Sequence, residues 1–211
     1  MVESTATAPR TKPAINFRPV SPAAHLAEQF AAAEVTGPRA VRLREVPFQT
    51  MIGVRAVSGT DAAGRIETRL GVALPTACGT VATGEGVAVL WLSPDEFLVM
   101  TEQQPAELTG ALVEALDGEP GSATDLSANR TTYELDGPSA RSVLEKGCPL
   151  DLHPRVFATG TAYVTLIGSV PVIVWKVAEE VYRILPRSSF ADFLGRWLVD
   201  AMAEFMVPEL P

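Results

Sequence analysis

The sequence predicts an α+β protein made of two similar units, each a mostly antiparallel sheet covered by helices, a layered α+β architecture. Two observations lead to this fold class. Stretches rich in β-branched and aromatic residues alternate with stretches whose apolar residues recur every three or four positions. The order of these stretches also repeats along the chain, with a spacing of 78 residues around the first helix of each unit.

Helices are expected where an apolar stripe is bounded by capping residues, prolines and glycines. Thr60 is expected to cap the second helix, and Ser188 or Ser189 the last one. The stripe of the last helix is the longest, and we interpret it as core packing rather than as a cofactor site. The five predicted helices cover 21–36, 61–70, 105–117, 138–146 and 188–205.

Strands are expected between these helices, where β-branched and aromatic residues gather. The segments 93–95 and 178–180 are predicted to be hairpin turns. We also interpret Gly84-Glu85-Gly86 as a hairpin turn. A dinucleotide-binding loop would follow a strand and open a helix, and these glycines precede a strand. The predicted strands are 48–57, 87–92, 97–101, 131–135, 163–167, 170–177 and 181–185.

Matching segments support a duplication. Gly79-Thr80 is expected to open a strand in the first half, and Gly160-Thr161 is its counterpart in the second. Trp91 and Trp175 also occupy corresponding places near a hairpin turn. The spacing widens from 81 to 86 residues downstream, which small turn insertions would explain. The alternative is chance similarity between two amphipathic, β-rich halves.

Three segments are expected along the chain. Residues 1–40 form an extended arm and a short helix, 41–120 the first α+β unit, and 121–211 the second, and the two units form one body. The first 20 residues are proline-rich and lack apolar periodicity. They are expected either to remain solvated or to become ordered on the surface of a partner.

Composition limits the classes of function. The chain has 211 residues, is 47% hydrophobic and carries a formal net charge of −8, which is enough apolar material for a full core. Its acidity argues against nucleic acid or an anionic membrane as the main partner. Two cysteines far apart, no secretory signal and no long apolar run predict a soluble, cytoplasmic protein.

Residues of the kinds that form metal and nucleophile sites are scarce. His25, His153, Cys78 and Cys148 are the only histidines and cysteines, and no two of them have metal-ligand spacing. Cys148 follows a predicted helix C-terminus, where the helix dipole disfavours a thiolate, so it is expected to be a small buried apolar residue. The sequence therefore predicts no catalytic residue and no metal site.

The densest polar segment between apolar elements is 125–130, with the sequence Asp-Leu-Ser-Ala-Asn-Arg. Its functional interpretation is a ligand or partner contact made by Asp125 and Arg130. Its structural interpretation is a loop between the two units in which Asp125 and Ser127 bind turn amides. The structural interpretation is favoured.

Several segments of the second unit together resemble a known family. The segment 125–130 is followed by 135–140, by 146–154 and by 182–191 with an aromatic-rich helix after it. In this order, over about residues 40–205, they resemble the gamma subunit of heterotetrameric sarcosine oxidase. That family is similar in fold to the folate-binding domain of glycine-cleavage aminomethyltransferases.

The resemblance implies a non-catalytic subunit that stabilises an oxidase complex. The complex would convert sarcosine to glycine, with hydrogen peroxide and methylenetetrahydrofolate as the other products. FAD, FMN, NAD, zinc and tetrahydrofolate are implied on the alpha, beta and delta subunits, and none on this chain. The family assigns no catalytic residue to its gamma subunit. The equivalent subunit of N-methylglutamate dehydrogenase is a second possibility with the same architecture.

Two other classes of function remain open. A stand-alone folate-binding or aminomethyl-transferring protein would need an acidic group for the pterin and a cation for the glutamate tail. The candidates by residue type are Asp125, Asp151, Arg130 and Arg187. A general scaffold with a different partner is the other class. The large apolar residues that the implied oxidase subunit would share between its core and an interface are Trp91, Phe97, Trp175 and Phe205.

Overall fold

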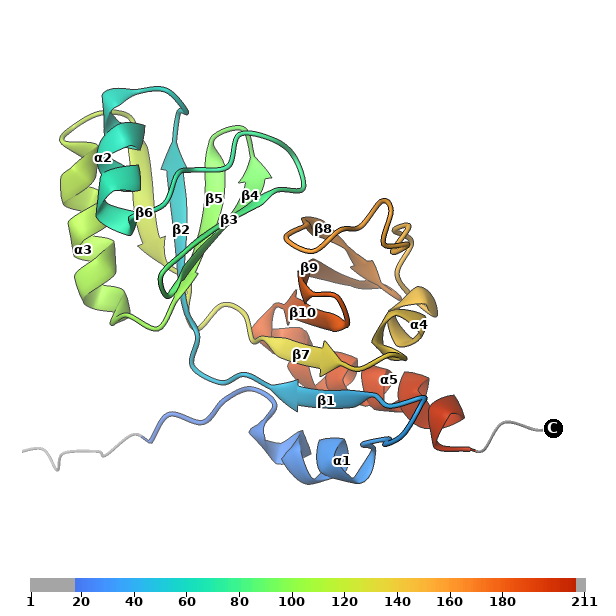
Figure 1. Cartoon of the computed structure of the whole chain (residues 1–211). Coiled ribbons are helices and arrows are strands. Elements are labelled where there is room, and N and C mark those ends of the chain that lie inside the picture. The colour runs from blue at the N-terminus through green and yellow to red at the C-terminus, as the bar shows by residue number, and fades with distance from the viewer. Residues whose placement is uncertain (1–17, 208–211) are drawn as a thin grey trace, which may run out of the picture.

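The computed structural model describes residues 18–207 and places them in two antiparallel sheets with helices on their outer faces (Figure 1). The predicted α+β class is therefore confirmed. The prediction for the first 17 residues of the arm lies outside the described residues. Among residues 18–207, no helix combines the length and the hydropathy that crossing a bilayer requires.

Each sheet has five strands. In spatial order, the first sheet consists of β3 (Val81–Gly84), β4 (Val87–Ser93), β5 (Glu96–Thr101), β2 (Thr50–Ala56) and β6 (Gly121–Asp125). The second consists of β8 (Ala162–Ile167), β9 (Val170–Ala178), β10 (Val181–Pro186), β7 (Tyr133–Asp136) and β1 (Arg42–Glu45). The three predicted hairpin turns connect β3 to β4, β4 to β5 and β9 to β10.

The helices cover the outer faces. Helices α2 (Asp61–Leu70) and α3 (Pro105–Leu116) lie side by side on the first sheet (Figure 1). The second sheet is covered by α1 (Ala27–Ala32), α4 (Ala140–Glu145) and α5 (Ala191–Met202). Three short 3₁₀ turns flank α1 and α5, at Ala24–Leu26, Ser188–Phe190 and Ala203–Met206.

Helix α2 agrees with its prediction at both ends. The Thr60 side chain accepts a hydrogen bond from the backbone N–H of Ala63 at 3.3 Å, and Gly71 ends the helix with φ +69°. The predicted serine cap of α5 is wrong. The Ser188 hydroxyl donates to the carbonyl of Ala128 at 2.8 Å instead, and α5 begins after Phe190 without a side-chain cap.

The two sheets pack against each other through their inner faces. Along β5, Phe97 and Val99 face the helices, whereas Leu98 and Met100 face the second sheet. Side chains from both sheets form this inner layer, which is buried on all sides; its members are Met51, Ala88, Leu90, Leu98, Met100, Ala162, Ile173, Trp175 and Leu185. The molecule is therefore a four-layer stack of helices, sheet, sheet and helices.

The two units also exchange a strand. Strand β1 lies at the start of the predicted first unit (41–120) but pairs with β7 of the second sheet, and β6 lies at the start of the predicted second unit (121–211) but pairs with β2 of the first sheet. Both exchanged strands therefore lie in the sheet of the other unit. The three short strands that lie outside the predicted strand ranges, β1, β3 and β6, are sheet edges.

The matched glycines Gly79 and Gly160 meet at the join between the sheets. The backbone N–H of Ala162 donates to Gly79 at 3.0 Å, and that of Val81 donates to Gly160 at 3.1 Å. These two hydrogen bonds make an isolated antiparallel β-bridge between Thr80 and Thr161. Segments that the sequence pairs as repeats are therefore partners in space.

Gly79 and Gly160 offer a matched test of this join, because both have positive φ, at +80° and +85°. A Cβ at Gly79 would lie 2.4 Å from the Tyr163 ring, which packs near Phe157, whereas at Gly160 nothing lies within 4 Å. We expect Gly160→Ala to lower the free energy of unfolding by about 1 kcal/mol through strain. Gly79→Ala should cost a further ~1–3 kcal/mol through overpacking. Urea unfolding measures both, and equal losses would contradict the described contact.

Tyr133 allows a second test. Its buried hydroxyl donates to the carbonyl of Ala191 at 2.6 Å, and burial strongly raises its pKa. We expect Tyr133→Phe to lower the free energy of unfolding by about 1 kcal/mol at neutral pH. Because the folded state holds the phenol neutral, the wild-type chain loses this contribution as pH rises above about 10, where the unfolded phenol ionises. The difference in free energy of unfolding between the wild-type chain and Tyr133→Phe should therefore narrow above that pH in urea titrations. A difference that stays constant would refute this account.

Candidate functional site

A cleft opens where the chain crosses between the units. The segment 46–49 links β1 to β2, the segment 126–132 links β6 to β7, and the N–H of Val46 donates to the carbonyl of Thr132 at 2.8 Å. We call the cavity of about 650 Å³ beside these segments the crossover cleft. Its lining residues are Pro19, Val20, Ser21, Pro22, Val46, Phe48, Gln49, Thr50, Met51, Glu102, Gln103, Gln104, Pro105, Ser127, Ala128, Arg130, Thr131, Thr132 and Ser188.

The start of the polar segment 125–130 has the turn structure that the structural interpretation predicts. The Asp125 carboxylate accepts from the N–H of Ser127 at 2.9 Å and from its hydroxyl at 2.6 Å. The Ser127 hydroxyl oxygen also accepts from the N–H of Met51 at 3.1 Å. Asp125 and Ser127 therefore fasten this segment to β2, at the wall of the crossover cleft.

The end of the segment is attached to the chain beyond β10. Arg130 donates from Nη1 to the carbonyl of Leu185 at 2.9 Å and forms a backbone bridge with Arg187. The N–H of Ser188 donates to the carbonyl of Asn129 at 2.9 Å. Burial lowers the pKa of the Arg130 guanidinium, and the charge of Arg187 lowers it further. Arg130 thus brings a partly desolvated positive charge to the cleft.

The four folate candidates do not come together in this cavity. Arg130 lines the crossover cleft, whereas Asp125, Asp151 and Arg187 are not among its lining residues. Asp151 accepts from the N–H of His153 at 2.9 Å and so stabilises its own loop. Two of the candidates, Asp125 and Asp151, are therefore bound to nearby backbone groups.

The other candidates lie mainly in the interior. Cys148 is buried, as predicted, and burial raises the pKa of its thiol, while Cys78 is exposed. Phe97, Trp175 and Phe205 are core residues, and Trp91, which is partly buried, packs against the apolar core that the first sheet forms with α2 and α3. Within residues 18–207, no three His, Cys, Asp or Glu side chains form a group that could hold a metal ion.

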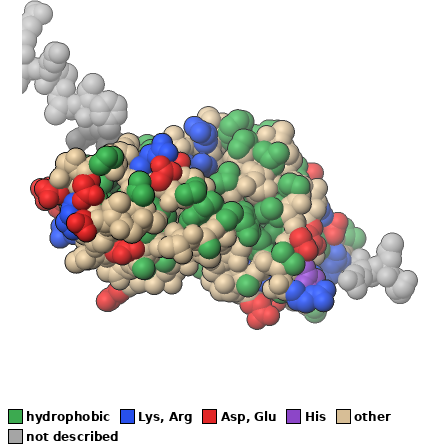
Figure 2. All heavy atoms as spheres, turned by 90° about the horizontal axis from the view of Figure 1, so that it is seen from above, with side chains coloured by type: hydrophobic (Ala, Val, Ile, Leu, Met, Phe, Trp, Pro, Cys, Tyr) green, Lys and Arg blue, Asp and Glu red, His purple; other side chains and the backbone are tan. Residues whose placement is uncertain are grey.

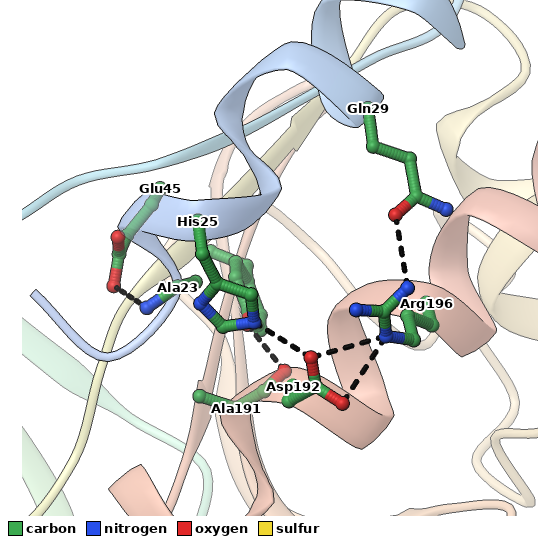
Figure 3. Close-up of polar contacts among 8 residues, drawn as sticks. Ala23, His25, Gln29, Glu45, Ala191, Asp192 and Arg196 are labelled. Carbon is green, nitrogen blue, oxygen red and sulfur yellow. Dashed lines mark hydrogen bonds and ion pairs between the residues drawn. The ribbon is translucent and has the colours of Figure 1, made fainter.

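His25, in the 3₁₀ turn that precedes α1, takes part in a group of polar contacts with α5. Its Nε2 lies 2.6 Å from Oδ1 of Asp192, and Arg196 donates to the same carboxylate at 3.0 Å and contacts Gln29 (Figure 3). These hydrogen bonds lower the pKa of Asp192, the bond from His25 most. Close by, the N–H of Ala23 donates to the Glu45 carboxylate at 3.1 Å. His25 thus holds the turn Ala24–Leu26, which precedes α1, against α5.

Two residues of the cleft have no signal in the sequence. Phe48 was predicted to begin a strand, but its φ is +56° and its side chain is 64% exposed. Thr132 was predicted to lie in a strand, yet it precedes β7, and its hydroxyl is buried without a hydrogen-bond partner among the described residues. A backbone conformation and an unpaired atom cannot be read from residue types.

Exposed apolar side chains are also found away from the cleft. Figure 2 shows apolar side chains gathered over one half of the upper face. In the second sheet, Val164 and Leu166 of β8 are exposed. Apolar surface of this kind is typical of proteins that contact other proteins.

Comparisons with known proteins agree with this architecture. Residues 56–204 match the sarcosine oxidase gamma subunit family. The sarcosine oxidase subunit gamma of Corynebacterium sp. strain U-96 is 51% identical over 191 residues, which are 90% of this chain and 93% of that protein. The subunit gamma of an Arthrobacter species is 48% identical over 189 residues, covering 89% of this chain and 92% of that protein.

Solved structures add the fold. A chain of heterotetrameric sarcosine oxidase from Corynebacterium sp. U-96 superposes with a TM-score of 0.88 at 50% identity, covering 92% of this chain and 99% of that one. Aminomethyltransferase T of the glycine cleavage system from Bartonella henselae matches with a TM-score of 0.56 at 14% identity, over 82% of this chain and 48% of that one. The second match confirms the predicted likeness of fold. The first, together with the family match over most of the chain, shows that this chain belongs to the sarcosine oxidase gamma subunit family.

Proposed function

We propose that this chain is the gamma subunit of a heterotetrameric sarcosine oxidase, which oxidatively demethylates sarcosine to glycine. The other products are hydrogen peroxide and methylenetetrahydrofolate. The observation that carries this proposal is the match in sequence and shape over nearly the whole length of a chain from such an oxidase. A match of this extent leaves little of the chain for a different architecture.

Within the complex, the chain has a supporting role, and its partners are the alpha, beta and delta subunits. FAD, FMN, NAD, zinc and tetrahydrofolate are held by those subunits. The contacts of the two candidate carboxylates favour a supporting rather than a catalytic role for this chain. Asp125 and Asp151 accept hydrogen bonds from backbone N–H groups of their own turns. Their positions fit stabilisation of loops better than proton transfer to a substrate.

The complex is cytoplasmic. Both cysteines support this location, since Cys78 is exposed and Cys148 buried and neither forms a disulfide. Proteins of reducing compartments keep such thiols free.

Co-expression tests the proposal. A tagged form of this chain, produced together with the other three subunits, should elute with them as one complex that makes hydrogen peroxide from sarcosine. Omitting the chain should lower the Tm of the remaining assembly by several degrees, because a bound partner stabilises the folded state.

The isolated chain is the control. It should fold and show no turnover of sarcosine. Turnover by the isolated chain, or its elution apart from a complete and active oxidase, would refute the proposed function.

A further inference from the structure

The crossover cleft has an apolar rim that its own fold leaves uncovered. Phe48 is 64% exposed, and its backbone lies in the left-handed region that bulky side chains rarely adopt. Val20, which also lines the cleft, is 76% exposed. The exposed Phe48 ring buries little apolar surface that could compensate for its backbone strain. Strain of this kind is typical of functional surfaces.

The cleft also has uncompensated positive charge. Among the described residues, neither Arg130 nor Arg187 forms an ion pair with a carboxylate, although the two are backbone bridge partners. Among residues 18–207, Glu102 is the only acidic residue that lines the cleft, and it is exposed. Arg187 lies beside the cleft rather than in its lining, and its charge acts on Arg130. A carboxylate that binds Arg130 would therefore also relieve the repulsion between the two arginines.

A buried hydroxyl supports the same interpretation. Thr132 is only 1% exposed and lines the cleft, and its Oγ1 has no hydrogen-bond partner among the described residues. Buried hydroxyl groups are nearly always paired in folded proteins. A polar group that enters the cleft could supply the missing partner.

We propose that the crossover cleft is the docking site for an acidic segment of another subunit of the oxidase. A carboxylate of that segment binds Arg130 in the cleft and compensates the charge of Arg187 beside it, and its apolar side chains cover Phe48 and Val20. This inference rests on the proposed function, because it requires the chain to be part of a complex. The occupant is a protein segment, since Phe48 and Val20 form an exposed rim that a small anion bound at the arginines would leave in water. Aromatic and arginine residues around a desolvated pocket are also the usual centre of protein interfaces.

Phe48→Gly separates a docking role from a structural one. Glycine adopts positive φ without strain, so the isolated variant should be at least as stable as the wild-type chain in thermal unfolding. Its association with the other subunits should nevertheless weaken by about tenfold or more, because the aromatic contact is lost. A purely structural Phe48 would give the opposite result, with lower stability and unchanged association.

Arg187→Glu tests the charge. The reversal should weaken association by about tenfold or more, with the larger effect at low salt. Arg69→Glu, an equal change of charge on exposed α2, and Val113→Ala, a loss of exposed apolar surface on α3, are matched controls that should associate as the wild-type chain does.

Association is measured by diluting the purified four-subunit complex and counting intact assemblies by mass photometry. If Phe48→Gly and Arg187→Glu assemble as tightly as the wild-type chain, the docking site is refuted while the proposed function stands. If the wild-type chain itself does not enter the complex, both are refuted.

Discussion

The packing of the two sheets against each other is the constraint on which the rest of the molecule depends. Each sheet has helices on its outer face, so its inner face would be exposed apolar surface if the other sheet were absent. Leu90 and Leu98 from one sheet and Ile173 and Leu185 from the other bury each other there. Since each Å² of buried apolar surface contributes about 25 cal/mol, burial of this layer stabilises the folded chain.

This packing also explains where the functional surface lies. Because the sheets lie face to face and exchange β1 and β6, two connecting segments must cross from one unit to the other at neighbouring positions. Those segments carry Phe48, Arg130 and Thr132. The cleft is therefore a consequence of the exchange. Its residues are held by backbone pairing on both sides, as a docking surface with a fixed shape requires.

The sequence predicted the parts of the fold that depend on apolar periodicity. Helix α2 was predicted with its observed bounds, and the central strands were found because both of their faces are apolar. The edge strands β1 and β6 were not found, since they are short and polar and depend on backbone hydrogen bonds to a distant segment. The polar segment 125–130 drew attention to one wall of the cleft. The sequence predicts a strand at Phe48 on the other wall, whereas its φ is positive, since a positive φ there depends on how the chain crosses between the sheets and not on residue type.

The strand exchange has a consequence for synthesis of the protein. Arg42 in β1 pairs with Asp136 in β7, 94 residues later in the chain. During translation, β1 therefore leaves the ribosome long before its pairing partner exists, and the second sheet cannot close until β10 has also emerged. Contacts so distant along the chain make folding slow, and meanwhile the nascent polypeptide carries an unpaired edge. The charged side chains of β1, Arg42, Arg44 and Glu45, are of the kind that protects such an edge from aggregation.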